Sequence, residues 1–258
     1  MNFTEEELLA KVALFFWPFV RINTLLLAIP VFSSKSAPVK FRIIISVLIT
    51  WVVMPFLPTL PTVELMSYEG FVITVQQIAI GLLTAFILEM VFSVMLVAGQ
   101  STAYSMGLGF ASMVDPASGM QVPVVAQIFI ISSSLFFMGV NGHLLAIEMI
   151  IESFQTLPIG GLGLSQDDLW RVIMWSAKIF SGGVLLALPI MSTILLVNIS
   201  FGVASKAAPQ LQIFGIGFPI TIMMGMILLW IILPSIIESF TFVLSDGFKL
   251  INQILRVS

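Results

Sequence analysis

The sequence contains no cysteine and very little charge. Only 9% of its 258 residues are Asp, Glu, Lys or Arg, and histidine occurs once. The absence of cysteine excludes disulfides, cysteine-based zinc sites and thiol catalysis. The formal net charge is −3, so no basic stripe exists to neutralise phosphates and nucleic acid is not an expected partner. Apolar residues instead make up 59% of the chain, which lies outside the range of soluble globular proteins.

Six apolar segments account for most of the chain. Each reaches the roughly 20 residues that a helix needs to cross a bilayer. Their bounds are about Val12–Phe32, Phe41–Leu60, Phe71–Ala98, Val122–Ile151, Trp170–Phe201 and Leu211–Leu244. They are interrupted by Pro18, Pro55, Pro58, Pro123, Pro189, Pro219 and Pro234, and by the pair Gly182–Gly183. The pattern predicts an all-α integral membrane protein of about six long, kinked hydrophobic helices, embedded in a lipid bilayer without a soluble domain.

Charges in the connections predict the orientation. Lys35, Lys40 and Arg42 lie in the first connection and Lys206 in the fifth, whereas the second and fourth carry acidic residues. Basic connections face the cytoplasm by the positive-inside rule. Both termini are therefore expected on the outer side of the membrane.

Polar side chains lie well inside the apolar segments. A charge at the centre of a helix that faces lipid on all sides would cost about 2.5–3.5 kcal/mol. Most of these helices should therefore contact other protein, and the chain is expected to be a subunit of a larger assembly. Packing or polar contacts between subunits are predicted for Gly99, Gln100, Ala103, Glu89, Glu148, Asn198, Lys206 and Pro209.

No constellation of residues predicts catalysis. His143 is the single histidine, and the metalloprotease pattern HExxH, the serine-hydrolase pattern GxSxG and the phosphate-binding pattern GxxxxGK[ST] are all absent. We interpret His143 as a polar residue that is hydrogen-bonded at a helix end. The chain is predicted to be non-enzymatic and to use no cofactor or metal.

A transporter for ions or small molecules is the alternative. Glu89, Glu148 and Glu238 lie within or at the ends of apolar segments, and buried carboxylates often mark proton or cation paths. An inverted repeat would support this hypothesis, but the two halves of the chain show no convincing similarity. The other interpretation is that each carboxylate pairs with a cation or amide of a neighbouring helix, such as Lys178.

The stretch Gly99–Gln121 is neither a clean apolar span nor a charged loop. Gly99, Ala103 and Gly107 form a stripe of small residues at every fourth position, which allows close helix packing in membranes. Beyond it, glycines loosen the backbone and Pro116 stops any helix from running through. Between them stand Phe110, methionines at heptad spacing and one charged residue, Asp115. This composition indicates a segment that can bend away from its neighbours and pack against them again.

The residues Gly99-Gln100, Met106–Phe110, Asp115-Pro116 and Asn198–Phe218 resemble the FliR family, the R subunits of the flagellar type III export gate, related to the T component of injectisomes. The resemblance covers essentially the whole chain. It implies a complex with FliP and FliQ, with FlhB and FlhA nearby. It also implies a flagellar basal body in the bacterial inner membrane, unfolded flagellar proteins as substrates, and periplasmic termini.

The resemblance further implies one domain over residues 1–258. Residues 1–201 would be its P-like portion, with a plug loop at 106–119, and residues 202–258 a Q-like helical hairpin. The implied plug or gate consists of Met106, Gly107, Leu108, Gly109, Phe110, Ala111, Ser112, Met113, Val114 and Asp115. Phe110 would be its stopper, the glycines its hinges, and Met106 and Met113 soft seals beside it. The chain would thus line and plug the central export pore.

Overall fold

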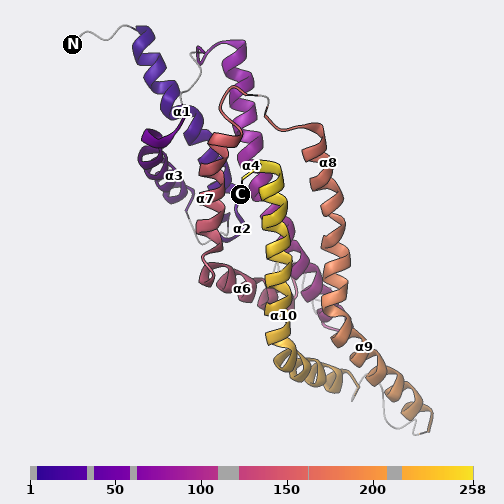
Figure 1. Cartoon of the computed structure of the whole chain (residues 1–258). Coiled ribbons are helices and arrows are strands. Elements are labelled where there is room, and N and C mark those ends of the chain that lie inside the picture. The colour runs from indigo at the N-terminus through magenta and orange to yellow at the C-terminus, as the bar shows by residue number, and fades with distance from the viewer. Residues whose placement is uncertain are drawn as a thin grey trace. The chain divides into compact units, whose positions relative to one another are not determined.

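The computed structural model describes residues 5–33, 38–58, 63–109, 122–161, 163–207 and 217–257. These residues form helices and no strand (Figure 1), which confirms the all-α prediction. The elements are α1 (Glu5–Ala28), α2 (Pro30–Ser33), α3 (Val39–Val53), the 3-10 turn η1 (Met54–Phe56), α4 (Tyr68–Ser105), α6 (Val124–Gly139), α7 (Gly142–Thr156), α8 (Gln166–Trp175), α9 (Ala177–Ala207) and α10 (Phe218–Leu255).

Four described stretches are long and apolar enough to cross a membrane, namely Val39–Phe56, Tyr68–Ser105, Gln166–Lys206 and Phe218–Leu255. The bent pair α6 and α7 adds a fifth if it counts as one span. Six spans were predicted. The first predicted span is not among these five, because α1 provides only the shorter apolar stretch Val12–Ala28. The helix ends before Pro30, since a proline disfavours helical backbone at the residue that precedes it.

Several prolines lie where helices continue. Pro18, Pro189 and Pro234 are inside α1, α9 and α10, and α9 also runs through Gly182 and Gly183 without a break. Membrane helices tolerate such residues because neighbouring groups meet the freed backbone carbonyls. In α9 the hydroxyl of Thr193 also donates to the carbonyl of Pro189, one turn earlier, at 2.8 Å.

The chain divides into two compact units. Unit 1 comprises Met1–Met90, Phe137–Met174 and Ser245–Ser258, and unit 2 comprises Val91–Phe136 and Trp175–Leu244. Because α4 and α10 each contribute residues to both units, neither unit is a continuous piece of sequence.

In unit 1, α1 packs against α3. Trp17 is fully buried, and its ring nitrogen donates to Thr74 Oγ1 at 3.2 Å. Ser46 of α3 donates from Oγ to Oδ1 of Asn23 in α1 at 3.1 Å. Polar side chains of apolar helices thus find partners in neighbouring helices of the same chain, as apolar surroundings require.

In unit 2, α9 packs against the second half of α4. A Cβ placed on Gly183 would lie 2.7 Å from Cγ1 of Val97, so the glycine allows the two helices to approach. The ring of Phe240 in α10 is fully buried and meets Phe92 and Phe136 edge-on, at centroid distances of 5.5 and 6.0 Å. Edge-on aromatic pairs of this kind add to the energy of burial.

Candidate functional site

The second half of α4 carries the predicted small-residue stripe. A Cβ placed on Gly99 would lie 2.5 Å from Cα of Ala126 in α6, a distance that real Cβ atoms do not adopt. Ala103, one turn later, is fully buried. The close approach predicted for Gly99 is therefore made within the chain, between the backbones of α4 and α6. Contact of the same stripe with another subunit stays a prediction.

Met106 follows α4 directly and packs on α10. Its side chain is fully buried, and a Cβ placed on Gly225 would lie 2.5 Å from its Cε and 2.7 Å from its Cγ. The methionine therefore lies directly on the backbone of α10, and a flexible thioether can fit such a surface.

Gly107 ends α4 rather than continuing the stripe. Its φ is +81°, its amide donates to the carbonyl of Tyr104, and the amide of Leu108 donates to the carbonyl of Ala103, both at 3.0 Å. This pair of bonds around a left-handed residue is the Schellman motif, which satisfies the last carbonyls of a helix. A Cβ at Gly107 would also lie 2.9 Å from Cε2 of Phe218. Conformation and packing thus both select glycine here.

The rest of the predicted plug lies outside the described residues, which resume at Val122. This applies to Phe110, Ala111, Ser112, Met113, Val114 and Asp115, and Pro209 also lies outside. The structure therefore describes only the first four residues of the predicted plug, Met106 to Gly109. Among them, Gly109 lies against the ring of Tyr104, with 2.7 Å between a Cβ placed on Gly109 and Cδ1.

The predicted polar contact residues lie on the surfaces of three helices. Glu89 of α4, Glu148 of α7, and Asn198 and Lys206 of α9 are exposed, and Gln100 is half-buried. Glu89 and Glu148 belong to unit 1, and Gln100, Asn198 and Lys206 belong to unit 2. The described residues contain no cluster of three or more His, Asp or Glu side chains suited to a metal ion.

His143 lies in the first turn of α7, at a helix end as predicted. Its ring faces that of Phe32 edge-on, with 6.3 Å between centroids. The prediction of a hydrogen bond is wrong for one ring nitrogen, because Nδ1 is buried and has no partner among the described residues.

Sequence reasoning missed a buried network around Arg21. Arg21 is fully buried, and its Nε donates to Oε1 of Gln77 at 2.7 Å. Its Nη1 donates to the carbonyl and hydroxyl oxygens of Ser153, at 3.1 and 3.0 Å, and its Nη2 to the carbonyl of Leu157 at 2.9 Å. The guanidinium carbon also lies 4.2 Å from the ring centroid of Phe154. Arg21 thus caps the carboxyl end of α7, where the helix dipole favours a cation.

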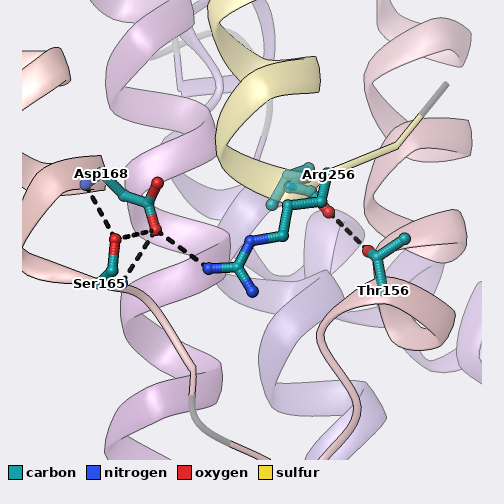
Figure 2. Close-up of polar contacts among 5 residues, drawn as sticks. Thr156, Ser165, Asp168 and Arg256 are labelled. Atoms are coloured by element: carbon teal, nitrogen blue, oxygen red, sulfur yellow. Dashed lines mark hydrogen bonds and ion pairs between the residues drawn. The ribbon is translucent and has the colours of Figure 1, made fainter.

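A second polar group joins the end of α10 to the start of α8, and we call it the C-terminal cluster (Figure 2). Ser165 and Asp168 form a capping box, in which Ser165 N donates to Asp168 Oδ2 at 2.9 Å and Asp168 N donates to Ser165 Oγ at 3.2 Å. Arg256 places Nη2 3.6 Å from the same Oδ2. Thr156 donates from Oγ1 to the carbonyl of Leu255, which fixes the end of α10 against α7.

Arg256 holds an unusual backbone conformation in this cluster. Its φ is +58°, and the amide of Val257 donates to the carbonyl of Asn252 at 3.2 Å. The residue therefore takes the position at which helices commonly place glycine. This turn buries Val257 and directs the Arg256 side chain to Asp168.

Comparison with known proteins identifies the family. The model of the family described as bacterial export proteins, family 1, matches residues 12–247. The chain is 34% identical to the flagellar biosynthetic protein FliR of Escherichia coli (strain K12) over 255 residues, 99% of this chain and 97% of that protein. It is 36% identical to FliR of Pectobacterium carotovorum subsp. carotovorum over 255 residues, again 99% and 97%. It is 32% identical to FliR of Buchnera aphidicola subsp. Acyrthosiphon pisum (strain APS) over the whole of both chains. The chain belongs to family 1 of the bacterial export proteins, the FliR family.

Proposed function

We propose that the chain is a structural and gating subunit of the flagellar protein-export gate. In this role it lines and plugs the central pore through which unfolded flagellar proteins leave the cytoplasm. The observation that carries the proposal is the similarity to flagellar biosynthetic proteins over nearly the full length. The apolar helices are long enough to cross a membrane, which supports a place in the bacterial inner membrane. Within that membrane we assign the chain to the flagellar basal body, with both termini in the periplasm.

The plug is the loop at residues 106–119. Its root is held by Met106, which is buried against α10, and by Gly107, whose Schellman motif ends α4. Displacement of the plug therefore begins after Gly107. Phe110 is the stopper and Met113 a soft seal beside it, and the closed pore excludes solutes by hydrophobic occlusion.

The partners are FliP and FliQ, with FlhB and FlhA nearby. Residues 1–201 form the P-like portion of the chain and residues 202–258 the Q-like hairpin. Contact with other subunits is supported by the exposed polar side chains of Glu89, Glu148 and Asn198 in apolar helices. Such groups are costly in lipid, so protein is expected to cover them. Gly99, Gln100, Ala103, Lys206 and Pro209 contribute further contacts between subunits.

Removal of the stopper tests the plug. Phe110→Gly and deletion of residues 107–112 should leave the complex assembled but make the membrane permeable to small solutes, measured as dye or ion leakage in cells. The control is Phe71→Gly, which removes an equally large ring from an exposed position in the first turn of α4. If the Phe110→Gly complex assembles and stays as tight as the parent, the plug assignment is wrong.

Copurification tests the assembly. The full chain, expressed in a bacterium that lacks its own FliR, should restore swimming and purify from membranes with FliP and FliQ in a fixed ratio. A transporter would behave differently, since the purified chain alone would carry an ion or small molecule into liposomes. Replacement of Glu89 or Glu148 by Gln should accordingly disturb assembly and leave proton flux unchanged.

A further inference from the structure

The polarity of α3 is the reverse of that of a helix on the surface of a soluble protein. Its buried side carries three polar residues at every fourth position, Arg42, Ser46 and Thr50. The opposite side is apolar, and we call it the outer face of α3. Its members are between 56% and 72% exposed and are Phe41, Ile44, Leu48, Trp51 and Val52. A helix in water turns its polar side outward, so water is not the expected neighbour of this face.

The polar groups on the buried side of α3 have partners within the chain. Ser46 Oγ donates to Oδ1 of Asn23 in α1 at 3.1 Å, and Thr50 Oγ1 donates to the carbonyl of Ser46 at 2.7 Å. Arg42 Nη1 donates to the carbonyl of Leu27 in α1 at 3.2 Å. Such contacts between helices are favourable in apolar surroundings, where an unsatisfied polar group is costly. α3 therefore uses its polar side to bind α1 and leaves its apolar side exposed.

The ends of the outer face differ from its middle. Lys40 is exposed at the start of α3, and Trp51 and Phe56 are exposed toward the other end. A cation at the end of a membrane span lies near the phosphates of lipid head groups, and tryptophan is enriched at the interface between lipid and water. The 18 residues from Val39 to Phe56 make a helix roughly 27 Å long, close to the roughly 30 Å of bilayer hydrocarbon. The face therefore matches a lipid layer in length as well as in polarity.

The composition of the outer face favours lipid over another helix. Helices in membranes pack through small or polar residues, as Gly99 of α4 does against Ala126 of α6. The outer face of α3 has only bulky apolar side chains. α9 is different, because it exposes Asn198 and Ser200 and leaves open space around Gly202. The two helices therefore suit different neighbours, namely lipid for α3 and protein for α9.

We propose that the outer face of α3 contacts lipid acyl chains in the assembled export complex and is not covered by another subunit. This inference rests on the proposed function, which supplies the membrane and the assembly. Leu48 lies near the middle of the hydrocarbon, and Lys40 reaches the phosphates of the lipid head groups. α3 is therefore at the periphery of the complex.

The lack of cysteine in the chain allows single spin labels to report the surroundings of α3. The complex is placed in liposomes of phosphatidylethanolamine and phosphatidylglycerol, and a label is attached to one introduced cysteine at a time. Labels at Ile44→Cys, Leu48→Cys and Val52→Cys should be accessible to oxygen, which dissolves in lipid tails, and protected from a water-soluble nickel chelate. The ratio of oxygen to nickel accessibility should be highest at Leu48→Cys and lower at Phe41→Cys and Phe56→Cys, nearer the two ends.

Asn198→Cys is the control for a face covered by protein. Asn198 is exposed on α9, and its label should become protected from both reagents when the complex assembles. Protection of Leu48→Cys from both reagents in the complex would overturn the proposal, because a subunit would then cover the outer face. Accessibility of Leu48→Cys to the nickel chelate would also overturn it, because the face would then border water.

Changes of side-chain size give a second test that needs no label. Leu48→Ala and Leu48→Phe should leave the yield of assembled complex within about twofold of the parent, because fluid acyl chains adapt to either shape. Gly99→Val is the comparison, since it overpacks the contact with Ala126 and should lower the yield. A loss of yield with either Leu48 variant that equals the loss with Gly99→Val would contradict the proposal.

The two proposals fail in different ways. If the parent chain neither restores swimming nor purifies with partner subunits, the proposed function is wrong. If the parent chain does both and Leu48→Cys is protected from both reagents, the role in export stands and only the lipid contact of α3 is lost.

Discussion

Arg21 and Gln77 are joined by a 2.7 Å hydrogen bond from Nε to Oε1, although 56 positions separate them in the chain. The other hydrogen bonds of Arg21 go to Ser153 and Leu157, so one side chain links α1, α4 and α7. None of these hydrogen-bond partners is a carboxylate. The positive charge is met by the carbonyl end of α7, which carries the negative end of the helix dipole.

Replacement of Arg21 should destabilise the fold strongly. Arg21→Met keeps an unbranched side chain but leaves Gln77 and the carbonyls at the end of α7 without their donor. Each unsatisfied buried group costs about 1–3 kcal/mol, so we expect a loss of about 3 kcal/mol or more in the free energy of unfolding. Denaturant unfolding in detergent, followed by tryptophan fluorescence, measures this. Arg171→Met, at an exposed position of α8, should stay within about 0.5 kcal/mol of the parent.

Substitution of Gly99 should separate α4 from α6. Gly99→Val introduces atoms where Ala126 already lies, and overpacking of this kind costs about 1–3 kcal/mol. The midpoint of thermal unfolding in detergent should fall accordingly. Gly202→Val is the matched control, because no atom lies within 4 Å of a Cβ placed on Gly202. Equal midpoints for the two variants would contradict the close approach of α4 and α6.

Gly107→Ala should weaken the end of α4. An alanine in the left-handed region costs about 1–2 kcal/mol, and its Cβ would also press on the ring of Phe218. Combining it with Phe218→Ala should restore only the part of the stability lost to the contact. Gly139→Ala should not destabilise, because space is open around Gly139. Thermal unfolding of the three variants separates backbone conformation from packing.

Arg256 should give opposite results for two small replacements. Arg256→Ala removes the contact with Asp168 and keeps the left-handed residue, so it should lose about 0.5 kcal/mol. Arg256→Gly removes the same contact but also relieves a backbone cost of about 1–2 kcal/mol, so it should be neutral or stabilising. Unfolding free energies of the two variants check the difference. If the glycine variant is no more stable than the alanine variant, the left-handed conformation at position 256 does not carry the expected cost.

Composition and motifs predicted much of the molecule. The apolar composition indicated a membrane protein, and the length of the apolar segments indicated helices. Motifs such as Met106–Phe110 indicated the FliR family, which the family match over residues 12–247 confirms. Membership of a family that exports proteins, and is not enzymatic, also confirms the prediction that the chain is not an enzyme. The spacing of Gly99 and Ala103 indicated close helix packing because both residues lie on one face of a single helix.

The missed features depend on partners far away in the sequence. Arg21 stands in the apolar segment Val12–Phe32, and its acceptors at Ser153 and Leu157 are 132 and 136 positions away. No local pattern carries that information. Gly107 fits the four-residue spacing of the stripe, yet its φ of +81° removes it from the helix. The same local sequence around a glycine is compatible with a helix that continues and with a helix that ends. The conformation of the backbone that follows the glycine determines which of the two occurs.

The length of α4 has a mechanical consequence for the surrounding membrane. Its 38 residues form one uninterrupted helix. At 1.5 Å per residue it is about 57 Å long, nearly twice the roughly 30 Å of hydrocarbon in a typical bilayer. An upright α4 would leave almost half of its length outside the lipid tails, whereas one kept wholly within them would lean by roughly 60° from the membrane normal. In a bilayer of this thickness, the remaining turns of α4 must therefore either lie outside the lipid tails or be accommodated by a steep inclination of the helix.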